Sequence, residues 1–223
     1  MALLLHHTHP LDVTPAQAVT LQRTLAPLVR EELLAHTPRT IAGVDMSVRD
    51  DQVQAAVVVL SFPDLFLIEQ AIWRGPVEFP YVPGLLSFRE APAVLRALEQ
   101  LQVQPDVLMT DSQGRAHPRR FGLACHLGVL LDRPVWGVAK SKLTGVHAEL
   151  PSEPGAQLAL YSGREVIGTV LRTRIRANPV YISVGHRITL PEAVALTLAC
   201  TKGYRLPEPT RLAHLLSKKQ AEV

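Results

Sequence analysis

DVLMTDSQGRAHPRRFGLACHLGVLLDRPVWGVAKSKL, at residues 106–143, is the stretch that decides the fold we expect for this chain. Its apolar run at residues 107–109 is typical of a strand buried on both faces, and Asp111 follows where that strand should end. Apolar residues at helical spacing cover residues 121–131, and a second short apolar run occupies residues 135–139. The stretch therefore predicts a strand, a loop, a helix and a second strand parallel to the first.

Lys140 directly follows the second of these strands. Parallel neighbouring strands end at the same edge of a sheet, and open α/β sheets carry their chemistry at that edge. We therefore expect the loops that carry Asp111 and Lys140 to open side by side.

Three more apolar segments precede this stretch, at residues 41–48, 53–60 and 65–73. The turns between them are short, which predicts an antiparallel meander. Adding the parallel crossover gives the fold class that we expect, an α/β protein with a mixed central sheet flanked by helices.

The chain beyond residue 143 predicts further strands. Two are expected to join near Ser162, and another covers residues 180–184. The second strand of the pair should alternate apolar residues with Arg172, Arg174 and Arg176. This row is either a phosphate track or a solvated strand face, and the solvated face is the favoured interpretation.

Capping boxes mark two helices, one at Thr14 with Gln17 and one at Thr189 with Glu192. Pro27 should kink or shorten the first of these helices. A last amphipathic helix is expected from about Thr210.

The helix after the proline-rich residues 78–90 has two candidate starting points. Ser87 and Glu90 match a capping box, but with Ser87 as N-cap the ring of Pro92 would meet the carbonyl of Phe88. The sequence therefore favours a start near Glu90, which would let this carboxylate face a site at the junction of loop and helix.

Composition limits the class of protein. The 223 residues fit one α/β domain, so we expect residues 1–223 to form a single domain. The chain is 47% hydrophobic and 19% charged, without a signal-peptide pattern or an apolar run that could cross a bilayer, which predicts a cytoplasmic protein. A net charge of +3 allows a nucleic-acid partner without requiring one. Cys125 and Cys200 lack metal-ligand spacing and are expected to be small core residues.

Three carboxylates come from separate elements: Asp45 from the strand at residues 41–48, then Glu90 and Asp111. For Asp45 alone, a functional role and an exposed position on an edge strand are about equally supported. Together the three supply hard oxygen ligands, which suit Mg²⁺ or Mn²⁺ rather than zinc. One or two such ions can activate a water and stabilise the leaving oxygen of a phosphodiester.

Three basic side chains are further candidates. His117 and Lys140 are placed to hydrogen-bond a scissile phosphate, although each alone is better explained as a loop residue, with His117 holding the turn before Pro118. His214 lies among leucines, and considered without the other candidates it is best explained as a histidine at the boundary of the core.

Motifs along nearly the whole chain resemble those of the endonuclease V family. The matching blocks are GVDMSV at residues 43–48, PYVPGLLSFRE at 80–90, DSQGRAHPRRFGLACHLGVLLD at 111–132, GVAKSKL at 137–143, PVYISVGHRI at 179–188 and PEPTRLAH at 207–214. They follow the family's order, so their combination is far more specific than any single block.

The resemblance implies a ribonuclease H-like fold and a metal-dependent DNA repair endonuclease that recognises deoxyinosine, the product of adenine deamination. It implies Mg²⁺-dependent hydrolysis of the second phosphodiester bond 3′ to the lesion, which leaves a 3′-hydroxyl and a 5′-phosphate; Mn²⁺ is expected to substitute. The partner is then DNA containing deoxyinosine, with a monomeric enzyme and no membrane. Two alternatives stay open: an inosine-specific ribonuclease on single-stranded RNA, and a catalytically silent nucleic-acid-binding module.

The resemblance also implies roles for particular residues. The catalytic residues would be Asp45, Glu90, Asp111, His117, Lys140 and His214, of which the three acids bind metal, His214 lies close to them, and His117 and Lys140 lie near the scissile phosphate. Tyr81 looks like the family's wedge, an aromatic ring that enters the base stack where the altered base leaves it. The hypoxanthine pocket would be lined by Gly84, Leu86, Gly137, Ala139 and Leu143.

The chain departs from the family's pattern at two positions. Ser112 stands where glycine is more usual after the aspartate, and we expect it to tighten the loop beside the metal or to alter how the loop receives DNA. Cys125 replaces a small residue, with little expected consequence.

Overall fold

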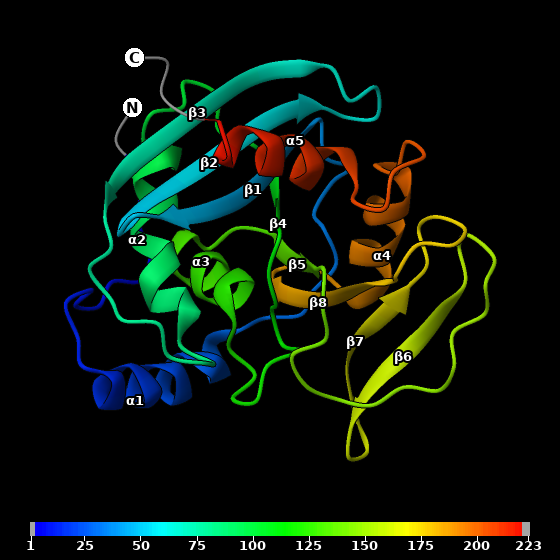
Figure 1. Cartoon of the computed structure of the whole chain (residues 1–223), viewed down its shortest axis with the longest axis horizontal. Coiled ribbons are helices and arrows are strands. Elements are labelled where there is room, and N and C mark those ends of the chain that lie inside the picture. Colours follow the sequence, from blue (N-terminus) through cyan, green and yellow to red (C-terminus); the bar gives the residue numbers. More distant parts are fainter. Residues whose placement is uncertain (1–2, 220–223) are drawn as a thin grey trace.

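A computed structural model describes residues 3–219 and has a mixed sheet of eight strands in the order β3-β2-β1-β4-β5-β8-β7-β6 (Figure 1). The strands are β1 (Thr40–Arg49), β2 (Gln52–Ser61), β3 (Leu67–Pro76), β4 (Val107–Thr110), β5 (Val135–Ala139), β6 (Gln157–Ser162), β7 (Glu165–Leu171) and β8 (Val180–His186). The helices are α1 (Pro15–Leu25) with a 3-10 turn after it (Ala26–Leu28), α2 (Leu86–Leu98), α3 (Leu123–Leu131), α4 (Leu190–Ala199) and α5 (Glu208–Ser217). The predicted α/β class with a mixed, helix-flanked sheet is confirmed.

The sheet joins an antiparallel meander to a parallel crossover, as predicted. β1 pairs antiparallel with β2 and β2 with β3, whereas β4 runs parallel to β1 and β5 parallel to β4. The register sets Val44 of β1 opposite Thr110 of β4, and the amide of Asp111 donates to the carbonyl of Val44 at 2.9 Å. The next residues of the two strands, Asp45 and Asp111, are therefore neighbours at one edge of the sheet.

The two faces of the sheet bury separate apolar cores. Ala42 and Val44 pack with residues of α2 and α3, whereas Ile41 packs with residues of α4 and α5. Because side chains alternate along a strand, Gly43 and Asp45 share the α5 face with Ile41. α5 crosses β1 and β2 on that face (Figure 1).

Gly43 allows α5 to lie directly on β1. A Cβ atom at this position would lie 1.9 Å from the carbonyl oxygen of Pro209, a distance at which the helix would have to move. The absence of a side chain lets the start of α5 approach the strand, which brings His214 over Asp45.

The predicted start of α2 is wrong. The helix begins at Leu86, with Leu85 as N-cap and Pro92 inside it, so Glu90 lies in the second turn. An interior proline destabilises a helix by about 3 kcal/mol. The longer helix, however, buries Leu85 and Phe88 almost completely, and each such side chain contributes about 1.5–3 kcal/mol, which offsets the proline.

The predicted arginine row on a strand is also wrong. β7 ends at Leu171, because its neighbours end there too: Leu171 pairs with Gln157 at the start of β6 and with Val180 at the start of β8. Arg172 instead donates to the backbone carbonyls of Pro151 and Ala177, each at 2.6 Å. Arg174 and Arg176 are exposed outside the strands, so the three arginines do not form a row on one strand face.

Other predictions from the sequence hold. Both capping boxes form, and α1 ends before Pro27. Cys125 and Cys200 are buried free thiols. In the part of the chain that the structure describes, no helix is both long enough and apolar enough to span a membrane.

Candidate active site

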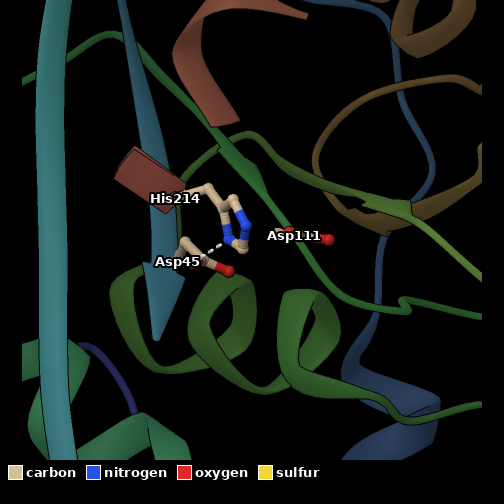
Figure 2. A group of neighbouring side chains, drawn as sticks. All are labelled: Asp45, Asp111 and His214. Carbon is tan, nitrogen blue, oxygen red and sulfur yellow. Dashed lines mark hydrogen bonds and ion pairs between the residues drawn. The ribbon is translucent and has the colours of Figure 1, made fainter. Parts of the chain in front are cut away.

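Side chains from four elements meet where β1, β4 and β5 approach one edge of the sheet. Asp45 comes from β1, Asp111 follows β4, Lys140 follows β5 and His214 comes from α5. Figure 2 shows the side chains of Asp45, Asp111 and His214 close to one another. One ligand atom from each residue lies within 4.8 Å of the others. The predicted common edge for Asp111 and Lys140 is confirmed, since the two side chains form an ion pair.

Asp45 is held by α5. One carboxylate oxygen, Oδ2, lies 2.9 Å from Nδ1 of His214 and 2.7 Å from Oγ of Ser217, which donates to it. Only 8% of Asp45 is exposed, so these contacts replace those that water would make. Sequence reasoning missed Ser217, whose one signal was its position three residues after His214 on the same helical face.

Nδ1 of His214 has two neighbours. It lies 2.9 Å from Asp45 and 3.0 Å from Nζ of Lys140. When protonated it donates to the carboxylate, and when unprotonated it accepts from the ammonium, so it serves one contact at a time. His214 thus bonds either to the carboxylate on β1 or to the ammonium after β5.

The carboxylates of the cluster repel one another. Burial, together with the charges of Asp45 and Asp111, raises the pKa of Glu90 to about 8. Burial and the charge of Asp45 raise the pKa of Asp111 to about 7, although Lys140 opposes this shift. The site therefore binds a proton more readily than ordinary carboxyl groups do, and a divalent cation would relieve the same repulsion.

The donor set fits a hard cation. Asp45 and Asp111 offer oxygen and His214 offers nitrogen at ligand distance from one another. Glu90 lines the same cavity. Within residues 3–219, however, the tight group of ligand atoms consists of Asp45, Asp111 and His214 and does not include Glu90. The structure thus brings together two of the three predicted metal acids with His214, and places the third acid beside them.

A cavity of about 400 Å³ opens beside the carboxylates. Of the residues that the resemblance assigns to the substrate, five line it: Tyr81, Gly84, Leu86, Ala139 and Leu143. Gly137 does not. A Cβ atom there would lie 2.3 Å from the carbonyl oxygen of Ser112, so this glycine allows β5 to pack against the loop after β4. A direct role for Gly137 in the pocket stays a prediction.

His117 is buried and has both ring nitrogens engaged. Nε2 donates to the carbonyl oxygen of Gly84 at 3.0 Å, and Nδ1 accepts from the amide of Arg119 at 3.1 Å. Burial, with a smaller contribution from the charge of Arg119, lowers the pKa of His117 to about 4, so the ring is neutral at pH 7. These contacts favour a role in holding the loop, and a phosphate contact stays a prediction.

Tyr81 is the most exposed aromatic ring at the cavity. It is 68% exposed, with the guanidinium carbon of Arg89 6.0 Å from the ring centre. Prolines on either side, Pro80 and Pro83, restrict the loop that carries it. An exposed ring on a restrained loop can stack against a planar ligand without first being uncovered.

Ser112 joins its loop to the end of β4. Its hydroxyl lies 2.6 Å from that of Thr110, which in turn donates to the carbonyl of Trp136 at 3.3 Å. Glycine at this position could not make the contact with Thr110. The expected tightening of this loop therefore has a physical basis in the structure.

Comparisons with known proteins agree on one family. Residues 23–215 match the family model described as Endonuclease V. A curated relative, endonuclease V of Alkalilimnicola ehrlichii, is 50% identical over 229 residues that cover 99% of this chain and 99% of the relative.

Solved structures of this family share the fold. Endonuclease V of Streptomyces avermitilis superposes with a TM-score of 0.87 at 43% identity and covers 92% of each chain. Endonuclease V of Ciona intestinalis, in complex with a 23mer DNA containing an inosine followed by a ribo-adenosine, superposes with a TM-score of 0.79 at 25% identity over 92% of this chain and 97% of that one. The predicted ribonuclease H-like fold is thereby confirmed. From the matched family segment, the relatives and the fold together, we conclude that this chain belongs to the endonuclease V family.

Proposed function

We propose that this protein is a DNA repair endonuclease that recognises deoxyinosine and hydrolyses the second phosphodiester bond on the 3′ side of it, leaving a 3′-hydroxyl and a 5′-phosphate. The observation that carries the proposal is the cluster of Asp45, Asp111 and His214 beside a cavity with an exposed tyrosine at its rim. The cluster suits the hydrolysis of a phosphodiester, and the cavity with its exposed tyrosine suits the capture of a base.

Asp45 and Asp111, with Glu90 beside them, would hold Mg²⁺, and Mn²⁺ would substitute because both are hard cations that prefer oxygen. The bound cation supplies Lewis-acid chemistry that lowers the pKa of a water and stabilises developing charge on a phosphodiester. His214 and Ser217 orient the Asp45 carboxylate through hydrogen bonds of 2.9 and 2.7 Å. Such supporting contacts fix the direction in which a ligand atom points.

Lys140 carries the ammonium closest to the carboxylates and would contact the scissile phosphate once a cation replaces it as the partner of Asp111. Tyr81 would enter the stack left by the extruded base. The base itself would lie in the cavity between Gly84 and Leu86 on one side and Ala139 and Leu143 on the other. His117 would act mainly by holding Gly84, through the 3.0 Å contact to its carbonyl.

One observation favours a second candidate function, an inosine-specific ribonuclease. The Ciona relative binds a strand in which a ribonucleotide directly follows inosine. A family site that accommodates a ribose at that position has room for the 2′-hydroxyl of RNA. A catalytically silent binding module has less support, because all three acids are present in this chain.

The test uses a 5′-labelled duplex with one deoxyinosine, incubated with the protein and Mg²⁺. We expect one cut, at the second bond 3′ to the lesion, with no cut in an inosine-free duplex or with Asp111→Asn. Equal cutting by Asp111→Asn would contradict the proposal. Faster cutting of a matched inosine-containing single-stranded RNA would favour the ribonuclease, and metal-independent binding without any cut would favour the silent module.

We further propose that residues 1–223 act as one domain and as a monomer in the cytoplasm. One continuous sheet supports the first point, since every strand pairs with a neighbour in it.

A further inference from the structure

Gln22 is a buried polar side chain on the N-terminal helix α1, one residue before the segment that matches the family model. It is completely buried, and a buried amide is unfavourable unless its hydrogen bonds are made. Its nitrogen donates to the carbonyl oxygens of Gly84 at 2.9 Å and Phe121 at 3.0 Å, and its oxygen accepts from Nε of Arg119. Every polar atom of the amide therefore has a partner.

The carbonyl oxygen of Gly84 is where several side chains converge. Nε2 of Gln22 lies 2.9 Å from it, Nη2 of Arg119 lies 2.7 Å from it and Nε2 of His117 lies 3.0 Å from it. A backbone carbonyl has two lone pairs, so three donors saturate it. We call this arrangement the Gly84 clamp, formed by Gln22, Arg119 and His117.

The clamp fixes the direction of one peptide at the edge of the cavity. Gly84 lines the cavity, and its φ of +79° is a conformation that residues with side chains rarely adopt. A Cβ atom at Gly84 would also lie 2.8 Å from Nη2 of Arg119. The peptide is thus held with its carbonyl toward Gln22, Arg119 and His117.

The direction of that peptide matters for the choice of base. Deamination of adenine replaces an amino donor by a carbonyl acceptor and turns the adjacent ring nitrogen from acceptor into donor. A loop whose peptides are free to rotate offers a base either N–H or C=O groups, and so accepts both patterns. Here the Gly84–Leu85 peptide is fixed at both groups, its C=O by the clamp and its N–H by the carbonyl of Val82 at 2.9 Å. The adjoining peptides of the cavity lining therefore keep one arrangement, which is the condition for discrimination between the two bases.

We propose that Gln22 and Arg119 are positioning residues that, through the carbonyl of Gly84, set the selectivity of the cavity for hypoxanthine over adenine. This inference rests on the proposed function, because it assumes that the cavity receives the base. The chain between β3 and α2, which includes Gly84, passes close to α1 (Figure 1), so a helix remote from the acids reaches the base site directly.

The first test compares Gln22→Met with Gln100→Met, a matched change at an exposed glutamine just after α2. Methionine keeps the length of the side chain and removes its hydrogen bonds. We expect the ratio of dissociation constants for adenine and deoxyinosine duplexes to fall at least about tenfold in Gln22→Met, as for the loss of a hydrogen bond between buried groups. The maximal single-turnover rate on deoxyinosine should stay within about threefold, and Gln100→Met should match the wild type.

A purely structural role for Gln22 predicts something different. The melting temperature would fall, but the folded variant would keep its selectivity, and that result would overturn the proposal. If the wild type itself does not cut deoxyinosine DNA, the proposed function fails. If the wild type cuts and the folded variants keep full selectivity, only the clamp fails.

Arg119 gives a second route if Gln22→Met does not fold, because its side chain is only partly buried. Arg119→Met should reduce selectivity as Gln22→Met does, with a less than additive effect in the double variant. Arg119→Lys should not restore selectivity, because one ammonium lacks the planar fork that contacts Gln22 and Gly84 together. Equal weakening for both duplexes with rescue by lysine would instead indicate a phosphate contact and would overturn the proposal.

Discussion

The two sides of the cavity are built in different ways. The acidic side, with Asp45 and Asp111, lies on adjacent parallel strands whose backbone hydrogen bonds set the spacing of the carboxylates. The side with Tyr81 and Gly84 is a loop, held in place by side chains from α1 and from the loop after β4. The acidic side holds groups that repel one another, whereas the loop side holds groups whose hydrogen bonds are satisfied.

This difference suggests a division of labour. Closely spaced carboxylates are unfavourable without a cation, so the acidic side is arranged for chemistry at the expense of stability. The loop side is held by hydrogen bonds to the carbonyl of Gly84 and is arranged for shape and direction. Changes on the acidic side should therefore affect rate, and changes on the loop side should affect which base is accepted.

The largest expected effect is that of Asp111→Asn. Loss of a carboxylate ligand removes several kcal/mol of charge stabilisation, which corresponds to a decrease of at least about 10³-fold in the cleavage rate. Single-turnover cleavage of a deoxyinosine duplex measures it. A decrease of less than tenfold would mean that the acidic side does not carry the chemistry.

A smaller effect is expected for Tyr81→Ala on the loop side. Stacking of a base on an aromatic ring is worth about 1–3 kcal/mol, so affinity for the deoxyinosine duplex should fall about 5- to 160-fold. Fluorescence anisotropy with labelled duplexes measures this affinity. Tyr161→Ala, at another exposed tyrosine on the edge strand β6, is the control and should bind as the wild type does.

The acidic side also predicts how stability depends on pH. The pKa of Glu90 is about 8 and that of Asp111 about 7 in the folded, metal-free protein, both above the ordinary carboxyl values near 4. These two groups therefore bind more protons in the folded than in the unfolded state between about pH 4 and pH 8. Below about pH 6.5 the buried His117 and His126 act in the opposite direction, because burial lowers their pKa values to about 4 and about 3. Stability should therefore fall as pH rises from about 6.5 to 8, and thermal melts over this range measure the trend.

Mn²⁺ binding and the variant Glu90→Gln test this prediction further. Because the cation competes with protons for the same carboxylates, its stabilising effect on the melting temperature should grow from pH 6 to pH 8. Glu90→Gln should make the pH dependence of the metal-free protein less steep. A metal-free stability that rises from about pH 6.5 to pH 8 would contradict the pKa values of the cluster.

The smallest expected effect is that of Ser112→Gly. The change removes the 2.6 Å contact with the hydroxyl of Thr110, worth about 1 kcal/mol, and adds backbone freedom to the loop. The free energy of unfolding should fall by about 1–2 kcal/mol in urea titrations, with the cleavage rate within about threefold of wild type. A large loss of rate would show that the hydroxyl takes part in the chemistry.

The sequence predicted the acidic side better than the loop side, for a physical reason. Apolar runs at residues 41–48 and 107–109 reveal strands. The carboxyl ends of parallel strands lie at the same edge of a sheet, which places Asp111 and Lys140 together. The clamp has no such pattern, because Gln22 and Gly84 are 62 residues apart and meet through side chain and backbone. Ser217 was missed because a serine in a helix ordinarily bonds to its own backbone.

The two wrong predictions have a common origin, since both applied a rule about local sequence at positions where contacts with the rest of the fold determine the structure. Pro92 argued for a late start of α2, but the burial of Phe88 outweighed it. The alternation after Leu171 continued in the sequence, but both partner strands begin opposite Leu171, so the sheet ends there and Arg172 bonds to the backbone of Gly155 and Ala156 in the loop before β6.

The division of labour is tested most directly by single-turnover kinetics of Asp111→Asn and Gln22→Met on deoxyinosine and adenine duplexes over a range of protein concentrations. This measurement separates the maximal rate from the dissociation constant. We predict that Asp111→Asn lowers the rate and keeps the selectivity of binding, whereas Gln22→Met keeps the rate and loses selectivity. A variant on either side that lowers both quantities in proportion would contradict the account.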